Sequence, residues 1–242
     1  MSEGMELFLK IVILVACSYF IGGIHFAAII SKIKGIDIKT LGSGNPGTMN
    51  MLRNFGVSTA VLTLILDAFK GAIPAIVGYF LLYDNEILGN VLPTAPVWLG
   101  FYMAEGTKAG LYIGGLSVII GHVFPIIKNF RGGKGVASSV GIFLVADPIV
   151  ALISFTAAFF YLFFFKYGSV ASFIFLFGTA ITEIILAILF KDSILDIILI
   201  LGILLLILWA HRSNIVRLFK GTESDINIRR QLKKKKDGKL LK

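Results

Sequence analysis

Seven long apolar segments run through this 242-residue chain, and they limit its possible folds more than any other feature. Their approximate bounds are residues 7–31, 57–82, 109–127, 135–146, 149–165, 170–190 and 194–210. Most of them approach the roughly 20 residues that a helix needs to cross ~30 Å of hydrocarbon. Hydrophobic residues make up 57% of the chain and charged residues only 15%, unlike a soluble globular protein. The sequence therefore predicts an all-α integral membrane protein.

The distribution of charge indicates how many segments cross the membrane. Segment 135–146 has only 12 residues, and runs of this length are often re-entrant. If it does cross, four polar stretches share one side of the membrane and carry 19 of the 23 lysines and arginines. These stretches are residues 32–56, 128–134, 166–169 and 211–242. Because basic loops face the cytoplasm, we expect seven transmembrane helices, the N-terminus outside, the C-terminus cytoplasmic and the active site on the cytoplasmic face.

Two further features bear on the domain organisation. Glu3 and Glu6 stand where a signal peptide would carry lysines, so the first segment is expected to be a retained span. Cys17 is the only cysteine, so neither a disulfide framework nor a cysteine-based metal site is expected. We expect one membrane domain over residues 1–224. The basic tail, residues 225–242, is expected to contact anionic lipid weakly and not to bind nucleic acid.

The loop between the third and fourth segments carries the strongest functional signal. Within Gly121–Ala137, GHVFPIIKNFRGGKGVA, three glycines surround one lysine in the order Gly132, Gly133, Lys134 and Gly135. Glycines let backbone N–H groups approach an anion closely, and the lysine adds charge beside a helix expected to start at Val136. No serine or threonine follows the lysine, so the loop is not a nucleotide-binding P-loop. An ordinary basic loop is the alternative, but it does not account for the glycines.

A second polar motif lies between the first two segments. Leu41–Asn54, LGSGNPGTMNMLRN, formally matches the dinucleotide pattern G-x-G-x-x-G, but the flanking membrane segments leave no place for the β-α-β unit that pattern requires. A turn rich in Gly, Asn and Pro is the simpler alternative. The hydrogen-bonding side chains of the motif exceed what a turn needs, and these are Ser43, Asn45, Asn50 and Arg53.

A third motif, HRSNIVRLFKGTE, follows the last apolar segment at His211–Glu223. Its Arg217 and Lys220 are typical of residues that anchor a helix at the membrane surface. His211, Asn214 and Glu223 are instead candidates for orienting a substrate or handling protons near a phosphate.

These three motifs, in this order, resemble the signature motifs of the bacterial acyl-phosphate:glycerol-3-phosphate acyltransferases, the PlsY-type membrane enzymes. The resemblance covers nearly the whole chain, with departures at Gly23, His25, Thr48, Met49 and Arg131. It implies transfer of a fatty acyl group from acyl phosphate to the 1-hydroxyl of glycerol 3-phosphate, which yields lysophosphatidic acid and phosphate in phospholipid biosynthesis. It further implies a monomeric, multi-pass enzyme of the bacterial inner membrane that needs no cofactor and no metal.

The resemblance and the residue chemistry together define the expected site. Catalytic roles are expected for Ser43, Lys134, His211, Asn214 and Glu223. Substrate binding is expected from Gly44, Asn45, Gly47, Asn50, Arg53, Gly132, Gly133, Gly135, Ser169 and Ser172. The glycine backbone and Ser43 would hold the acyl phosphate, while Arg53, Lys134 and Asn214 would hold the glycerol phosphate. Acyl phosphate is already activated, so we expect direct attack by the acceptor hydroxyl. An acylated Ser43, activated by a distant His211, is the alternative.

Two other functions would also collect cationic groups at an anion site. An organophosphate transporter should place its site near the bilayer midplane on broken helices, often with inverted repeats, and no repeat is evident in the chain. An acyltransferase that uses acyl-CoA or acyl carrier protein would usually carry an H-x-x-x-x-D pair. None of the three histidines begins one.

Several residues inside the predicted spans also carry expectations. Asp67 and Lys70 are three positions apart and are expected to form an ion pair that supports the site. His122 is expected to shape the adjoining loop. The G-x-x-x-G run Gly110–Gly114 predicts a close helix contact. The aromatic run Phe159–Phe165 is interpreted as packing or lipid-facing surface, with a lining for the acyl chain as the alternative.

Overall fold

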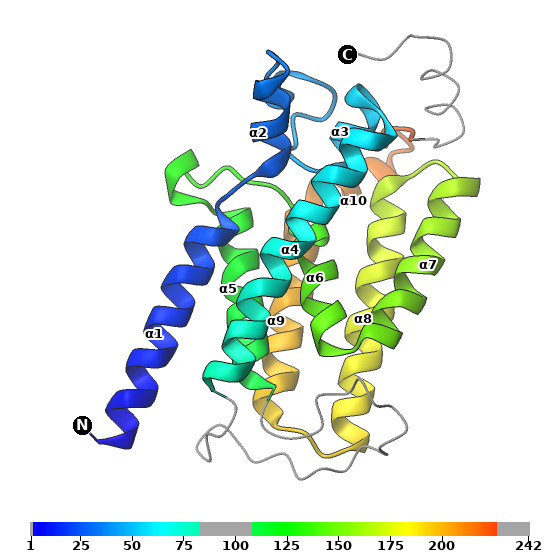
Figure 1. The fold of residues 1–242 in the computed structure, drawn as a ribbon. Coiled ribbons are helices and arrows are strands. Elements are labelled where there is room, and N and C mark those ends of the chain that lie inside the picture. The colour runs from blue at the N-terminus through cyan, green and yellow to red at the C-terminus, as the bar shows by residue number, and fades with distance from the viewer. Residues whose placement is uncertain (1, 83–107, 227–242) are drawn as a thin grey trace.

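The computed structural model describes residues 2–82 and 108–226, which are helical apart from short connections and one isolated bridge (Figure 1). The first described stretch holds α1 (Glu3–Gly22), α2 (Phe26–Ile33), η1 (Ile38–Thr40), α3 (Thr48–Phe55) and α4 (Val57–Leu81). The second holds α5 (Ala109–Val123), η4 (Ile126–Lys128), α6 (Val136–Ala146), α7 (Pro148–Phe164), α8 (Gly168–Leu189), α9 (Ile194–Ala210) and α10 (Arg212–Phe219). The predicted all-α class is confirmed for these residues.

Four stretches of helix in the described part of the chain are long and apolar enough to cross a membrane. They cover Glu3–Ile33, Val57–Leu81, Ala109–Lys128 and Gly168–Leu189. A fifth arises if α9 and α10, which meet at 56°, are taken as one broken span. α6 has 11 residues and α7 has 17, so both are shorter than the 18 residues taken as the minimum length of a membrane span. Helix length therefore supports four or five spans, where the apolar segments predicted seven.

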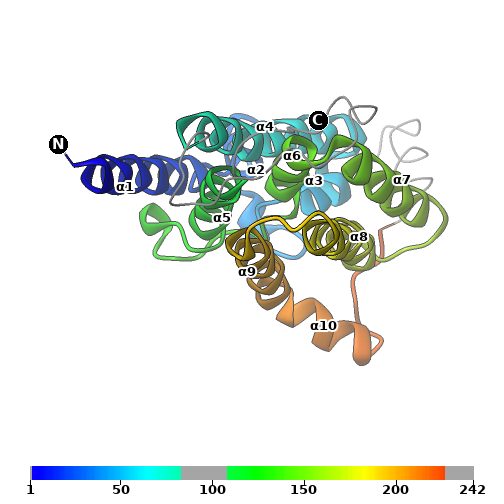
Figure 2. The same ribbon diagram turned by 90° about the horizontal axis from the view of Figure 1, so that it is seen from below.

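The short helices α6 and α7 form a hairpin within the bundle. Asp147 follows α6 and caps α7, because its side chain accepts hydrogen bonds from the N–H groups of Ile149 and Val150, each at 3.0 Å. Pro148 takes the first position of α7, where a missing N–H has no cost. Figure 2 shows α6 among α4, α5, α7 and α8, all of which it contacts. The Asp-Pro pair at the end of the fourth apolar segment thus reverses the chain.

Glycines bring α4 and α5 into direct backbone contact. A Cβ atom added to Gly110 would lie 2.1 Å from the carbonyl oxygen of Gly78, and one added to Gly114 would lie 2.4 Å from that of Pro74. No side chain larger than hydrogen fits at such distances, so the small residues set the spacing of the helices. The close contact predicted for Gly110–Gly114 is confirmed.

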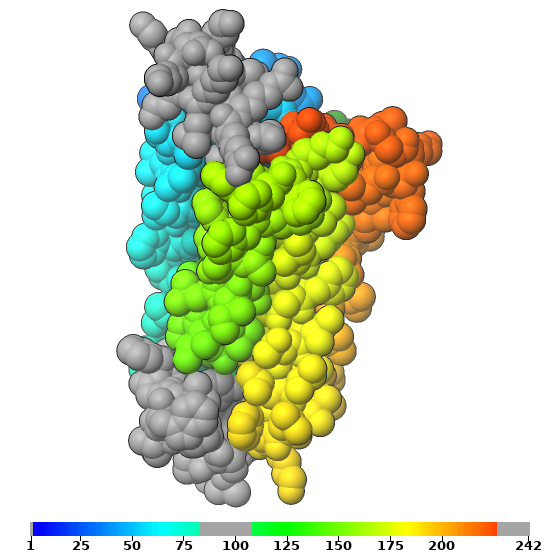
Figure 3. All heavy atoms as spheres, turned by 90° about the vertical axis from the view of Figure 1, so that its right-hand side faces the viewer, coloured from blue at the N-terminus to red at the C-terminus, as the bar shows by residue number. Residues whose placement is uncertain are grey.

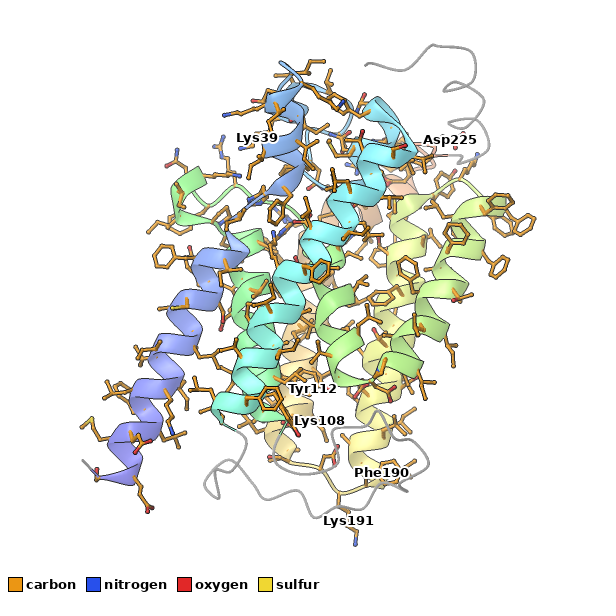
Figure 4. The ribbon with its side chains drawn as sticks, in the orientation of Figure 1. Lys39, Lys108, Tyr112, Phe190, Lys191 and Asp225 are labelled. Carbon is orange, nitrogen blue, oxygen red and sulfur yellow. The ribbon has the colours of Figure 1, made fainter. Side chains whose placement is uncertain are left out.

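The polar motifs gather at one end of the bundle. Figure 1 shows α2, α3 and α10 together at the end opposite the N-terminus. Lys39 and Asp225 lie at this end, whereas Lys108 and Lys191 lie at the other (Figure 4). The loops that the charge pattern assigned to one side of the membrane therefore share one end of the fold.

The segment after α10 folds back over this end. α10 projects sideways from the bundle, beyond the edge of the face formed by α7 and α8 (Figure 3). The N–H of Ile226 then donates to the carbonyl oxygen of Lys166 at 2.6 Å, and Asp225 forms an isolated bridge with Tyr167. Because Ile226 is also buried, this segment packs against the bundle as far as the last described residue.

Candidate active site

A cavity of about 390 Å³ lies among α3, α4, α6, α7, α8 and the segment after α9. The predicted site residues that line it are Ser43, Asn45, Gly47, Asn50, Arg53, Lys134, Gly135, Ser169, Ser172, His211, Asn214 and Glu223. Gly44, Gly132 and Gly133 do not line it. The fold therefore brings residues of all three sequence motifs to one cavity.

A chain of hydrogen bonds joins the second and third motifs. The ammonium of Lys134 donates to Oδ1 of Asn214, and Nδ2 of Asn214 donates to Oε1 of Glu223 at 2.7 Å. Asn214 lies in the first turn of α10 and is buried. Its amide thus orients the lysine through its oxygen and the carboxylate through its nitrogen.

Glu223 is a hub for hydrogen bonds and not a free carboxylate. Its Oε1 also accepts from Oγ of Ser169 at 3.1 Å, and its Oε2 accepts from Nε of Arg217 at 2.9 Å. The Glu223 side chain is only 5% exposed, and the Arg217 charge offsets part of the cost of burying it. Glu223 therefore fixes the positions of its neighbours instead of contributing a free base.

Arg217 is a site residue that the sequence analysis assigned to membrane anchoring. It lines the cavity and pairs with Glu223. A signal for this role was present, because Arg217 follows Asn214 by three positions and such residues share one face of a helix. Thr48 was also missed. It lines the cavity, and its buried hydroxyl has no hydrogen-bond partner among the described residues.

The polar end of the cavity carries an excess of positive charge. Arg53, Lys134 and Arg217 line it together with Glu223, and the second acid of the cavity, Asp67, is paired with Lys70. The pKa of Lys134 is lowered to about 8, chiefly by burial; the charge of Glu223 opposes this shift, and the charges of Arg217 and Arg53 add to it. Burial likewise lowers the pKa of Arg53. Anions would restore the balance of charge, so the cavity suits a phosphate ligand.

The start of α6 supplies backbone donors to the same end. Gly135 precedes the helix at φ +85°, a left-handed conformation that glycine adopts without strain. The first-turn N–H groups of a helix have no partner within the helix, and Val136 and Ala137 of this turn line the cavity. This arrangement fits the anion site predicted at the start of the helix.

Gly132 and Gly133 differ from the expectation for an anion cradle. The N–H of Gly132 donates to the carbonyl oxygen of Val123 at 3.2 Å, and that of Gly133 donates to the carbonyl oxygen of His122 at 3.0 Å. These two N–H groups are therefore engaged within the protein. Backbone donors for an anion begin one or two residues later in the loop.

The side chain of Asn50 forms hydrogen bonds with the backbone of the first motif. Its Oδ1 accepts from the N–H of Ser43 at 3.2 Å, and its Nδ2 donates to the carbonyl oxygen of Leu41 at 2.9 Å. Arg53 lies one turn later in α3, with its NH1 group 3.5 Å from Oδ1 of Asn50 and its buried Nε without a partner among the described residues. Asn50 thus shapes the loop, while Arg53 retains donors for a ligand.

His211 and Ser43 do not form a nucleophile pair in this structure. Nδ1 of His211 lies 2.8 Å from the carbonyl oxygen of Ile207, which can only accept, so Nδ1 carries the proton and Nε2 is left as an acceptor. The described residues include no hydrogen bond between the His211 ring and the exposed Ser43 hydroxyl. Ser172 also donates its hydroxyl internally, to the carbonyl oxygen of Gly168 at 3.0 Å.

The rest of the cavity is apolar. Its walls come from α4, α6, α7 and α8, and include Val57, Ala60, Val61, Leu64, Val140, Phe155, Ala158, Phe159, Leu162, Phe163 and Phe175. Val61 on α4 and Phe159 on α7 line the cavity and are also exposed on the outside of the bundle. The cavity therefore reaches the outer surface between these two helices. Part of the aromatic run on α7 lines the cavity, while Phe160 and Phe164 face outward.

No metal site accompanies this arrangement within residues 2–82 and 108–226, where no group of three or more His, Cys, Asp or Glu side chains could hold an ion. The polar groups that line the cavity are cations, amides, hydroxyls, the imidazoles of His122 and His211, and the carboxylates of Asp67 and Glu223.

Comparisons with known proteins agree with one another. A family model described as glycerol-3-phosphate acyltransferase matches residues 12–221. The glycerol-3-phosphate acyltransferase of Halalkalibacterium halodurans is 35% identical over 220 residues, which cover 90% of this chain and 97% of that protein. That of Macrococcus caseolyticus is 36% identical over 223 residues, which cover 92% and 100%. The crystal structure of PlsY, an integral membrane glycerol 3-phosphate acyltransferase, in its glycerol 3-phosphate form, matches with a TM-score of 0.72 at 30% identity over 92% of this chain and 98% of that chain.

Proposed function

Because the chain belongs to the glycerol-3-phosphate acyltransferase family, we propose that it transfers a fatty acyl group from acyl phosphate to the 1-hydroxyl of glycerol 3-phosphate. The products are lysophosphatidic acid and inorganic phosphate. Acylation of glycerol 3-phosphate is the activity for which the family is named. The acyl-phosphate donor and the position of acylation are the specific parts of the proposal.

The observation that carries the proposal is the division of the cavity into a cationic end and an apolar remainder. An acyl phosphate has the same division, with a charged head and a hydrocarbon tail. Its head fits beside Lys134 and the start of α6, and its tail fits between α4 and α7, where the cavity opens on the outer surface of the bundle. A lipid product could leave through the same opening into the bilayer.

The proposed chemistry is a direct acyl transfer. The oxygen of the 1-hydroxyl attacks the acyl carbonyl carbon and forms the new ester bond, while the bond from that carbon to the phosphate oxygen breaks. The departing phosphate takes the hydroxyl proton, so no protein base is needed. Lys134 and the N-terminus of α6 stabilise the negative charge that develops on the donor. The protein also contributes to the rate by holding the two substrates in line for the attack.

The polar residues divide into those that touch substrates and those that orient them. We assign Lys134 to a position between the two phosphates, and Arg53 and Arg217 to the glycerol phosphate as planar, bidentate donors. Ser43, at the cavity mouth, donates its hydroxyl to the acyl phosphate. Asn214 and Glu223 hold the cations in place, and His211 offers Nε2 to the acceptor.

The proposal includes a membrane arrangement. Seven crossings, with α6 and α7 as two short ones, place the N-terminus outside and the cavity at the cytoplasmic face, where the basic loops lie. We propose a monomer in the cytoplasmic membrane of a bacterium. Glycerol 3-phosphate would then enter from the cytoplasm, and the acyl phosphate from the bilayer.

An assay of the purified protein tests the donor. Glycerol 3-phosphate is supplied with palmitoyl phosphate, palmitoyl-CoA or palmitoyl acyl carrier protein, and lysophosphatidic acid is quantified by mass spectrometry. The expected result is product from palmitoyl phosphate alone, with one phosphate released per lipid formed. Product from a thioester and none from palmitoyl phosphate would overturn the donor assignment. Acylation at the 2-hydroxyl, read by NMR, would overturn the position.

A further inference from the structure

A second buried polar cluster adjoins the site: two of its members, Asp67 and His122, also line the cavity, and none has a role in the chemistry described above. It consists of Asp67 and Lys70 on α4, His122 near the end of α5, and His25 between α1 and α2, each at most 3% exposed. Burying such groups inside a membrane bundle is unfavourable unless they are paired. Their partners should therefore indicate what the cluster does.

The Lys70 ammonium determines which nitrogen of His122 carries the proton. An ammonium group has three donors and no acceptor. Nζ of Lys70 lies 2.5 Å from the carbonyl oxygen of Ile24 and 3.0 Å from Oδ1 of Asp67. Its third contact is Nδ1 of His122, at 2.8 Å. Nδ1 of His122 is therefore an acceptor, and the ring proton resides on Nε2.

The opposite edge of the His122 ring meets the glycine–lysine loop, residues 132–135. A Cβ atom added to Gly133 would lie 2.1 Å from Nε2 of His122, and one added to Gly132 would lie 2.0 Å from the His122 carbonyl oxygen. The same carbonyl accepts from the N–H of Gly133 at 3.0 Å and lies 3.1 Å from Nε2 of His25. The two glycines therefore lie flat against His122, and a side chain at either would displace the loop.

We propose that Lys70 and His122 are positioning residues, which hold the Gly132–Gly133 backbone in place so that the next residue, Lys134, reaches Asn214 inside the cavity. Asp67 neutralises Lys70 within the apolar bundle. The proposal rests on the proposed function, since that function places Lys134 at the phosphates of the substrates. It also explains the two glycines whose N–H groups are not free for an anion.

Three variants of the full-length protein separate this role from general packing. His122→Phe keeps a ring of similar size but removes the acceptor for Lys70. His122→Asn keeps an acceptor near the place of Nδ1. Ser117→Ala is the matched control, because Ser117 is another buried polar residue of α5 and does not line the cavity.

The first measurement is kcat/KM with palmitoyl phosphate and glycerol 3-phosphate as a function of pH. We expect His122→Phe to lose about tenfold or more, and His122→Asn and Ser117→Ala to stay within about threefold of the wild type. The alkaline loss of activity in His122→Phe should also move to higher pH, because a displaced Lys134 is better hydrated and its pKa rises. A loss that His122→Asn does not restore, or an alkaline limb that stays in place, would overturn the proposal.

The second measurement does not depend on the reaction. Hydrogen–deuterium exchange over residues 131–137 should be at least about tenfold faster in His122→Phe than in the wild type or Ser117→Ala. The double variant Asp67→Asn/Lys70→Met removes both charges together, so it leaves no unpaired buried charge, and it should also speed exchange. Unchanged exchange in the double variant would overturn the proposal even if His122→Phe failed to fold. A wild type that does not use palmitoyl phosphate would count only against the proposed function.

Discussion

The side-chain ammonium of Lys134 donates a hydrogen bond to Oδ1 of Asn214, which lies 80 positions later in the chain. This bond joins a glycine-rich loop to the first turn of α10. Nδ2 of Asn214 donates to Glu223 at 2.7 Å, and Nε of Arg217 donates to the same carboxylate at 2.9 Å. The cationic end of the cavity is thus one connected unit, and its members should respond together to substitution.

Glu223→Gln should uncouple this unit. A glutamine has one acceptor oxygen and no charge, so it cannot replace all three hydrogen bonds that Glu223 accepts from Ser169, Asn214 and Arg217. We expect kcat/KM to fall about 10- to 100-fold, or about 1.4–2.8 kcal/mol. Glu3→Gln, at an exposed site near the opposite end of the bundle, is the control. Activity within threefold of the wild type for Glu223→Gln would show that the hub does not matter.

The pH dependence should report Lys134. Its folded-state pKa is lowered to about 8, so the ammonium is present below that pH and is lost as the pH rises through it. Because the charged form binds phosphate, kcat/KM should decline above about pH 8. In Lys134→Arg this limb should disappear, since a guanidinium keeps its proton, although overall activity falls. The test is a profile from pH 6 to 9.5, and an alkaline limb that persists in Lys134→Arg assigns it to another group.

The helices and the place of the site could be predicted because both depend on local patterns. Apolar length predicted the bundle, and the asymmetry of lysine and arginine predicted which loops meet. The small residues of Gly110–Gly114 also predicted a close contact that the structure confirms. Each of these signals acts through neighbouring residues, so no knowledge of the tertiary structure was needed.

The partners of individual polar atoms could not be predicted in the same way. The N–H groups of Gly132 and Gly133 were expected at the anion, but they bond to carbonyls at the end of α5. Arg217 was assigned to the membrane surface, although its partner Glu223 returns to it through the turn after α10. Which atoms pair depends on the turns and contacts of the folded chain, which sequence spacing does not specify.

The apolar part of the cavity should limit the length of the acyl chain. Ala158 on α7 lines it and is buried, so Ala158→Phe would fill space that the tail would occupy. We expect the ratio of kcat/KM for palmitoyl phosphate to that for decanoyl phosphate to fall about tenfold or more. Leu152→Phe, on the exposed face of the same helix, should leave the ratio unchanged. An equal effect of Ala158→Phe on both donors would place the chain elsewhere.

Close glycine contacts should control stability independently of activity. A Cβ atom at Gly141 on α6 would lie 1.8 Å from the carbonyl oxygen of Ala68 on α4, and neither backbone can move without separating the helices. Overpacking of this kind costs about 1–3 kcal/mol. Gly141→Ala should therefore lower the melting temperature in detergent by about 4 °C or more, while Gly4→Ala, which meets nothing within 4 Å, should not. Equal melting temperatures would contradict the packing.

Lys134 is proposed to bind the phosphates of both substrates. The most direct measurement is the rate of lysophosphatidic acid formation by Lys134→Met, with palmitoyl phosphate and glycerol 3-phosphate both saturating, beside Lys39→Met as an exposed cationic control. We expect this rate to fall at least about 100-fold in Lys134→Met, with an unchanged melting temperature, and to stay at the wild-type value in Lys39→Met. Activity of folded Lys134→Met within about threefold of the wild type would contradict it.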